Sequence, residues 1–352
     1  MSSGPPPVRS ATLVVRLDSD GDVLLAGPAV RALSAGSRRL DLLVSRTGAA
    51  AAELLPGVDE VLEFDAPWSG YQPPPVDPVA VHSLVGLLAS RGYDLAVVLT
   101  SYHQSPLPMA LLARLAGIGR IVADSCDYPG ALLDVRHQRR EVHEVQAGLD
   151  LAEAAGCPLP AGDDGRLALI EPLPDPGVEL PTGSFVVVHP GASVPSRALA
   201  ADHAARMVAA LVNAGWEVAV TGGPNERDLA ARAAAAGALD LSGQTTFGQL
   251  ASVLKRAACV VVGNTGPAHL AAAVGTPVVS LFSPVVPIQR WAPHGVASVL
   301  LGDQDAGCRG TRARDCPLPG HPCLSGVDPI DVVAAVAELT GRRADLLTEA
   351  VG

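Results

Sequence analysis

Three closely spaced carboxylates stand out among the residues suited to chemistry. Asp18, Asp20 and Asp22 follow the apolar stretch 11–17 in the pattern D-S-D-G-D. An EF-hand calcium loop needs Gly at its sixth position and Glu at its twelfth, and here the glycine comes fourth. Three interpretations stay open: a D-x-D metal–sugar site, a solvated loop in which Asp22 caps a helix, and a general base at Asp22. Gly21 leaves space beside that carboxylate.

Three later segments have the composition of anion-binding loops. Segment 189–197 (HPGASVPSR) offers small residues, a hydroxyl and an arginine that can bind an anion through two hydrogen bonds. Glu226 follows two glycines in the next loop, where a carboxylate can accept ribose hydroxyls. Segment 263–269 (GNTGPAH) places glycines before a helix start, which favours a phosphate. The alternative for each segment is an ordinary strand–helix turn, with His269 a buried core histidine.

Short apolar strands alternate with helices along the chain, and this pattern predicts doubly wound parallel sheets. Expected strands are 11–17, 40–44, 60–64, 95–100, 120–123, 185–188, 217–221, 239–241, 260–262 and 277–282. Expected helices include 23–33, 49–55, 79–91, 109–116, 141–155, 202–214 and 328–339. Thr246 and Gln249 offer a capping box for a further helix that runs to Ala258. Thr265 or Gly266 can cap another helix, and Pro267 suits its first turn. Pro28 predicts a kink or break in its helix. The polar segments follow strands, so we expect them at the carboxyl edges of the sheets.

A Pro-, Gly- and Asp-rich stretch divides the chain into two halves. We predict a disordered lead at 1–10, a first Rossmann-like domain at 11–165 and a linker at 166–183. The second Rossmann-like domain is expected at 184–340 and a tail at 341–352. The ligand is expected in a cleft between the two domains.

Composition narrows the classes of partner. The chain has 352 residues, a formal net charge of −11, 3% aromatic residues and a mean hydropathy of +0.30. The acidic charge and scarce aromatic residues argue against nucleic acid. Segment 257–289 carries no charged residue, but its prolines and glycines interrupt any spanning helix. Without an apolar leader, we expect a cytoplasmic protein with no transmembrane segment and leave peripheral membrane contact open.

The cysteines do not form a recognisable metal pattern. Cys308, Cys316 and Cys323 are spaced C-x7-C-x6-C among glycine, arginine and proline, and no C-x2-C pair occurs. We expect a packed irregular loop there. Neither a metal site nor a cofactor is predicted.

The motifs taken together resemble glycosyltransferase family 9, the family of ADP-heptose:lipopolysaccharide heptosyltransferases. The resemblance rests on RLDSDGDVLLAGPAVRAL near the start, HPGASVPSR, TGGPNE, and GNTGPAHLAAAVGTPVVSLF before a Pro/Cys-rich stretch, and it extends over about 11–339. It implies the GT-B fold of two Rossmann-like domains and an inverting, metal-independent sugar transfer from a nucleotide-sugar donor, with an ADP-linked heptose favoured.

The resemblance also implies roles for individual residues. Asp22 would be the catalytic base, and a nucleotide diphosphate would be held by Ala192, Ser193, Arg197, Asn264, Thr265, Gly266 and His269, with Glu226 at the ribose. The family often has Asp at the position of Asn264 and Lys at that of Arg197. On the acceptor side we place Gly21, His103, Gln104 and Asp127.

The acceptor is the less defined partner. The first half lacks the basic cluster with which lipopolysaccharide enzymes hold acceptor phosphates, so a glycan, a glycolipid and a small molecule all stay open. Two alternatives to glycosyl transfer are kept: another GT-B nucleotide-sugar enzyme such as an epimerase, and a non-catalytic nucleotide-sugar binding module.

Overall fold

The computed structural model describes residues 9–101 and 104–342, and these form two compact units. The first unit ends at Ile170 and the second begins at Glu171, within the segment predicted as the linker. That segment is attached to both units. The Ile170 N–H donates to the Leu54 carbonyl at 2.8 Å, and Lys255 pairs with Glu171 at 2.5 Å.

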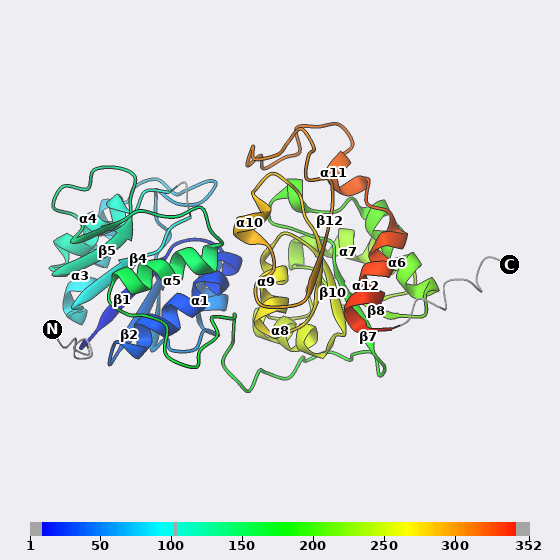
Figure 1. Cartoon of the computed structure of the whole chain (residues 1–352), viewed down its shortest axis with the longest axis horizontal. Coiled ribbons are helices and arrows are strands. Elements are labelled where there is room, and N and C mark those ends of the chain that lie inside the picture. Colours follow the sequence, from blue (N-terminus) through cyan, green and yellow to red (C-terminus); the bar gives the residue numbers. More distant parts are fainter. Residues whose placement is uncertain (1–8, 102–103, 343–352) are drawn as a thin grey trace. The chain divides into compact units, whose positions relative to one another are not determined.

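The first unit is a parallel sheet with helices packed on it (Figure 1). Its strand order is β3-β2-β1-β4-β5-β6. The strands are β1 (Thr12–Arg16), β2 (Leu40–Val44), β3 (Glu60–Glu63), β4 (Leu95–Val98), β5 (Arg120–Asp124) and β6 (Val135–His137). The helices are α1 (Asp20–Ala35), α2 (Ala49–Ala52), α3 (Pro78–Arg91), α4 (Leu107–Leu115) and α5 (Glu144–Ala154), with a 3-10 turn η1 (Arg46–Gly48). Helix α1 packs against α5, and α3 packs against α4.

The second unit repeats this plan with strand order β12-β11-β10-β7-β8-β9. Its strands are β7 (Phe185–His189), β8 (Glu217–Val220), β9 (Leu239–Asp240), β10 (Cys259–Gly263), β11 (Val278–Leu281) and β12 (Ser298–Leu301). Its helices are α6 (Ala201–Asn213), α7 (Arg227–Ala234), α8 (Phe247–Arg256), α9 (Gly266–Ala273), α10 (Ile288–Trp291), α11 (Pro322–Ser325) and α12 (Pro329–Thr340). Two 3-10 turns, η2 (Pro195–Arg197) and η3 (Pro224–Glu226), follow β7 and β8.

The central strands explain why the sequence pattern is so clear. Every residue of β1, β2 and β4 in the first unit, and of β7, β10 and β11 in the second, is buried. A parallel strand covered on both faces reads as a continuous Val- and Leu-rich run. Each fully buried side chain of this size contributes about 1.5–3 kcal/mol, so these strands anchor the loops that follow them.

The structure decides two points about the first helix: Pro28 does not break it, and Asp22 does not cap it. Helix α1 runs unbroken from Asp20 to Ala35, with Pro28 buried inside it. Packing of a helix outweighs the roughly 3 kcal/mol that an interior proline costs. Asp22 is not the cap. Ser19 occupies the N-cap position, and Asp22 is the third helical residue.

The chain ends differ from the predicted lead and tail in extent. Arg9 forms a bridge with Ser37, and its guanidinium donates to the Ala155 carbonyl at 2.7 Å. Residues 1–8 of the predicted lead and 343–352 of the predicted tail lie outside the described residues. Strands β6 and β12 and the short helices α10 and α11 escaped prediction because they are brief and weakly patterned.

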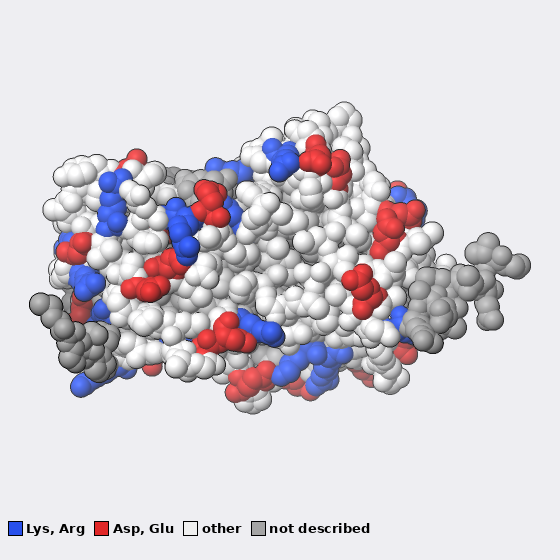
Figure 2. Space-filling model, in the orientation of Figure 1, with Lys and Arg blue, Asp and Glu red and all other residues white. Residues whose placement is uncertain are grey.

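Charged side chains of both signs are interspersed on the face drawn in Figure 2. Basic and acidic side chains lie there in small mixed groups, and most of that face is neither. Among the helices of the described segments, none has both the length and the apolar character that crossing a membrane requires.

Candidate active site

Polar residues of the first unit lie close together at the carboxyl ends of β1 and β4, in the loops that follow these two strands. Strands β1 and β4 are parallel neighbours, and β1 leads to β2 on its other side, so the strand order reverses here. Crevices at such switch points are where open α/β sheets bind ligands. A hydrogen bond connects the loop after β1 with the loop after β4, because Gln104 Nε2 donates to Asp18 Oδ1 at 2.6 Å. The Ser101 N–H in turn donates to Gln104 Oε1 at 3.0 Å.

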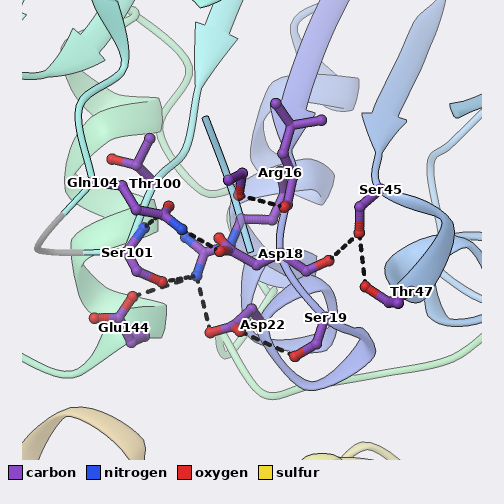
Figure 3. A network of polar contacts seen from close by, with 12 residues as sticks. Arg16, Asp18, Ser19, Asp22, Ser45, Thr47, Thr100, Ser101, Gln104 and Glu144 are labelled. Atoms are coloured by element: carbon purple, nitrogen blue, oxygen red, sulfur yellow. Dashed lines mark hydrogen bonds and ion pairs between the residues drawn. The ribbon is translucent and has the colours of Figure 1, made fainter. Parts of the chain in front are cut away.

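Arg16, the last residue of β1, is the centre of this network (Figure 3). Its Nε lies 3.0 Å from Asp18 Oδ2, and its Nη2 lies 3.1 Å from Asp22 Oδ1. Nη2 also donates to Ser101 Oγ at 3.2 Å and lies 3.7 Å from Glu144 Oε2. One buried guanidinium therefore contacts three carboxylates.

The three carboxylates differ in access to solvent. The side chain of Asp22 is 23% exposed, against 10% for Asp18 and 2% for Glu144. Burial raises the pKa of Asp18 to about 6, against the opposing effect of Arg16. Burial alone would lower the pKa of Arg16, but the neighbouring carboxylates, Asp18 foremost, raise it above its ordinary value. Arg16 is thus a permanent cation, and Asp22 is the most solvent-exposed of the three carboxylates around it.

The predicted acceptor-side residues fall into different surroundings. Gly21 is buried in the first turn of α1, and Gln104 uses its amide within the protein as described above. Asp127 is exposed after β5 and joins no contact with Asp22, its carbonyl accepting from Ser125 Oγ at 3.0 Å. His103 lies outside the described residues.

Three residues of this cluster escaped the sequence analysis. Arg16 ends an otherwise apolar strand, and a charged residue in a buried run is a signal that such reasoning can use. Glu144 and Arg139, which pair at 2.6 Å, carry no comparable signal because they lie in a densely charged segment.

The second unit positions its first small-residue loop after β7. Ala192 is half-buried, Ser193 is exposed, and Arg197 ends the turn η2. The buried Ser196 fixes this loop from behind, because its hydroxyl donates to the Ala313 carbonyl at 2.6 Å. Its N–H donates to the Arg314 carbonyl at 2.8 Å, and its own carbonyl contacts the His321 ring at 3.0 Å.

The loop after β10 lies against the loop after β7. A Cβ added to Gly263 would lie 2.5 Å from the Arg197 carbonyl oxygen, so only glycine fits at this close approach. Asn264 is buried and exchanges two hydrogen bonds with Ser283, at 3.1 Å to its carbonyl and 3.0 Å from its N–H. Its side chain thus braces the loop.

Helix α9 begins behind that loop. Thr265 is its N-cap residue and Pro267 its second residue, as the sequence predicted, and the Thr265 hydroxyl makes no capping hydrogen bond. Thr265 and Gly266 are partly exposed, whereas His269, in the first turn, is buried. The N–H groups of a first helical turn lack acceptors within the helix, so this exposed start is suited to an anion.

Glu226 closes the loop after β8. Its Oε2 accepts from the Gly223 N–H at 2.7 Å and lies 3.6 Å from His189 Nε2, and Gly191 has no room for a Cβ beside it. Burial lowers the pKa of His189, which favours the neutral ring, although Glu226 opposes the shift. The loops after β7 and β8 therefore meet at this carboxylate.

The cysteine-rich segment is packed as expected but is not wholly irregular, because Cys323 lies in the short helix α11. Cys308 and Cys323 are buried and Cys316 is half-buried, and all three are free thiols. Within residues 9–101 and 104–342, no three His, Cys, Asp or Glu side chains are grouped so that they could hold a metal ion.

Comparison with known proteins identifies the family of this chain. The model of glycosyltransferase family 9 (heptosyltransferase) matches residues 81–321, more than half of the chain. The chain belongs to glycosyltransferase family 9. The matched range of this family 9 protein includes every donor-side residue named above and begins after Asp22.

Individual relatives agree with the family match. Lipopolysaccharide heptosyltransferase 3 of Escherichia coli is 28% identical over 291 residues, covering 73% of this family 9 chain and 78% of its own length. A family 9 glycosyl transferase from Veillonella parvula DSM 2008 superposes with a TM-score of 0.74 at 17% identity, over 95% of this chain and 98% of its own. The ADP-heptose lipopolysaccharide heptosyltransferase II of E. coli gives 0.69 at 19% identity, over 94% and 99%.

These similarities confirm the predicted family, the GT-B type of fold and the assignment as a glycosyltransferase. The roles of individual residues are a separate question, which the proposal below takes up.

Proposed function

We propose that this enzyme transfers a heptose from an ADP-linked donor to an acceptor hydroxyl, with inversion and without a metal ion. The observation that carries the proposal is the position of Asp22: it is the most exposed of three carboxylates at the switch point of the first sheet, and it is held by Arg16. The names of the relatives supply the sugar and the nucleotide, because one of them is an ADP-heptose heptosyltransferase.

The chemistry follows from the residues at each site. The acceptor oxygen attacks the anomeric carbon and forms the new glycosidic bond, while the bond from that carbon to the diphosphate oxygen breaks. The bonding electrons leave with the diphosphate, and the hydroxyl proton passes to Asp22. Attack from the face opposite the leaving group inverts the anomeric centre. A positioned general base of this kind typically contributes about 10²–10⁴-fold.

The second unit is suited to the leaving nucleotide. The exposed start of α9 and the arginine of η2 together supply the positive charge that a diphosphate needs, so we assign that role to them in place of a metal. Ala192 and Ser193 belong to the same loop as Arg197. We assign Glu226 to the ribose of the donor nucleotide. His269 completes the set proposed from the family resemblance.

The acceptor is proposed by class only. The name of the 28% identical relative suggests a lipopolysaccharide core. The exposed Tyr128 and Asp127 after β5 suggest a neutral sugar or glycolipid instead of a phosphorylated one. Asp22 requires in either case a hydroxyl group on the acceptor.

One assay tests the function. The protein is incubated with ADP-heptose alone and with three acceptors: heptose-deficient lipopolysaccharide core, a neutral glycolipid and free monosaccharides. We expect ADP release only with an acceptor, no loss of rate in excess EDTA, and a product whose anomeric configuration is opposite to that of the donor by NMR. Isomerisation of the donor alone would instead support an epimerase, and EDTA-sensitive turnover restored by Mg²⁺ would contradict the metal-independent mechanism.

A further inference from the structure

Arg16 makes contacts that its place in a strand does not require. It belongs to β1, whose other residues pack in the core, yet its guanidinium reaches two residues beyond the strand to Asp18 and six beyond to Asp22. The contacts use different nitrogens of the guanidinium, Nε for Asp18 and Nη2 for Asp22. The planar fork of arginine is suited to this double contact, and the single ammonium of lysine is not.

Negatively charged groups outnumber positively charged groups around Arg16. Three carboxylates, Asp18, Asp22 and Glu144, face two guanidinium groups, those of Arg16 and Arg139. Asp124 lines the same small cavity and pairs with His137 at 2.5 Å. Glu144 has Arg139 at 2.6 Å, and Asp18 has Gln104. Apart from Arg16, the Asp22 carboxylate has only the Ser19 hydroxyl, at 3.2 Å, among its hydrogen bonds and ion pairs in the described residues.

We propose that Arg16 is the positioning residue of the transfer reaction, holding Asp22 as an oriented anion, and that Asp18 keeps Arg16 in place while Asp22 carries the proton. This inference rests on the proposed role of Asp22 as the base. When Asp22 gains the acceptor proton, its attraction to Arg16 weakens. Asp18, fixed by Gln104, and Glu144, fixed by Arg139, retain the guanidinium, so the site is ready again once Asp22 releases the proton to solvent.

The arrangement predicts opposite electrostatic effects of two substitutions. Removal of the cation in Arg16→Gln leaves Asp22 beside two carboxylates and makes its ionisation harder. Removal of a neighbouring negative charge in Asp18→Asn makes that ionisation easier. Arg16→Lys keeps the charge but not the double contact, so it should lower kcat and leave the ionisation of Asp22 nearly unchanged.

The ionisation can be measured without an acceptor. Protein with ¹³C in its aspartate carboxyl carbons is titrated by NMR, and the Asp22 signal is assigned by its absence in Asp22→Asn. We expect the Asp22 signal to titrate at higher pH in Arg16→Gln than in the parent, because an opposite charge beside it is lost, and at lower pH in Asp18→Asn, because a like charge is lost. The acidic limb of the kcat–pH profile should move in the same directions.

Unchanged midpoints in both variants would overturn the proposal, because a purely structural Arg16 affects stability without affecting the titration. If Arg16→Gln does not fold, Asp18→Asn decides alone. Disappearance of the acidic limb in Asp18→Asn would assign that limb to Asp18 and also overturn the proposal. Full turnover by Asp22→Asn would refute the proposed base, whereas an inactive Asp22→Asn with unmoved midpoints would refute only the role of Arg16.

Discussion

The Nη2 atom of Arg16 lies 3.1 Å from the Asp22 carboxylate, so the end of the first strand holds the third residue of the first helix. Both residues belong to one short segment, and the buried strand β1 fixes its start. A contact this local forms wherever β1 and α1 form. The position of Asp22 is therefore determined by the fold of the first unit itself.

Removal of the Arg197 guanidinium tests the diphosphate site. Arg197→Ala should weaken ADP binding by about 1.5–3 kcal/mol, the usual worth of a charge-assisted hydrogen bond, which is roughly 10- to 150-fold in Kd. Isothermal titration calorimetry gives the value. Arg309→Ala is the matched control, because Arg309 is an exposed arginine of the same unit that pairs with Asp305. Equal ADP affinity in the two variants would place the diphosphate elsewhere.

The Asn264 side chain should matter for stability. Asn264→Ala leaves the N–H and carbonyl of the fully buried Ser283 without their partner, and each unsatisfied group costs about 1–3 kcal/mol. Urea denaturation should show that loss in the free energy of unfolding. Asn264→Asp keeps an acceptor for the Ser283 N–H but loses the donor to its carbonyl, so its stability should be intermediate. An Asn264→Ala variant as stable as the parent would show that other groups satisfy Ser283.

The pH dependence of stability should reveal the half-buried carboxyl group of Asp20. Burial raises its pKa from 3.8 to about 6, against the opposing hydrogen bond from the Ala51 N–H. The folded state then binds a proton that the unfolded chain releases, so the contribution of Asp20 to stability falls as pH rises from about 4 to about 6. Asp20→Asn removes this penalty and keeps an acceptor for Ala51. Urea denaturation should therefore show the variant gaining stability over the parent between pH 4.5 and pH 7. An equal difference at both pH values would contradict the raised pKa.

The regular elements were predictable because their cause is local. The buried central strands read as continuous apolar runs, and the box of Thr246 and Gln249 that caps α8 is as predicted, with both hydrogen bonds present. The start of α9 at Gly266 likewise follows from Thr265 and Pro267. These features depend on residues a few positions apart.

The contacts within the candidate site were less accessible to sequence reasoning. Glu144 and Ser101 contact Arg16 from positions 128 and 85 residues further along the chain. No local sequence pattern predicts contacts between residues so far apart. The hydrogen bond from Gln104 to Asp18 joins two loops that are 86 residues apart in the chain, so it too could not be predicted locally. The break considered at Pro28 does not occur, because tertiary packing of the helix outweighs the local cost of the proline.

The most direct test of the account is the turnover of Asp22→Asn. An alcohol is a poor nucleophile until its proton is removed, and Asn keeps the shape and an oxygen for Arg16 while removing the base. With ADP-heptose and an acceptor from the panel above, kcat should fall about 10²–10⁴-fold, with ADP affinity and Tm nearly unchanged. Asp20→Asn is the control, since it alters a carboxylate two residues away that binds Ala51 and should retain near-normal turnover. A folded Asp22→Asn enzyme with the turnover of the parent would contradict the role of Asp22 as the base.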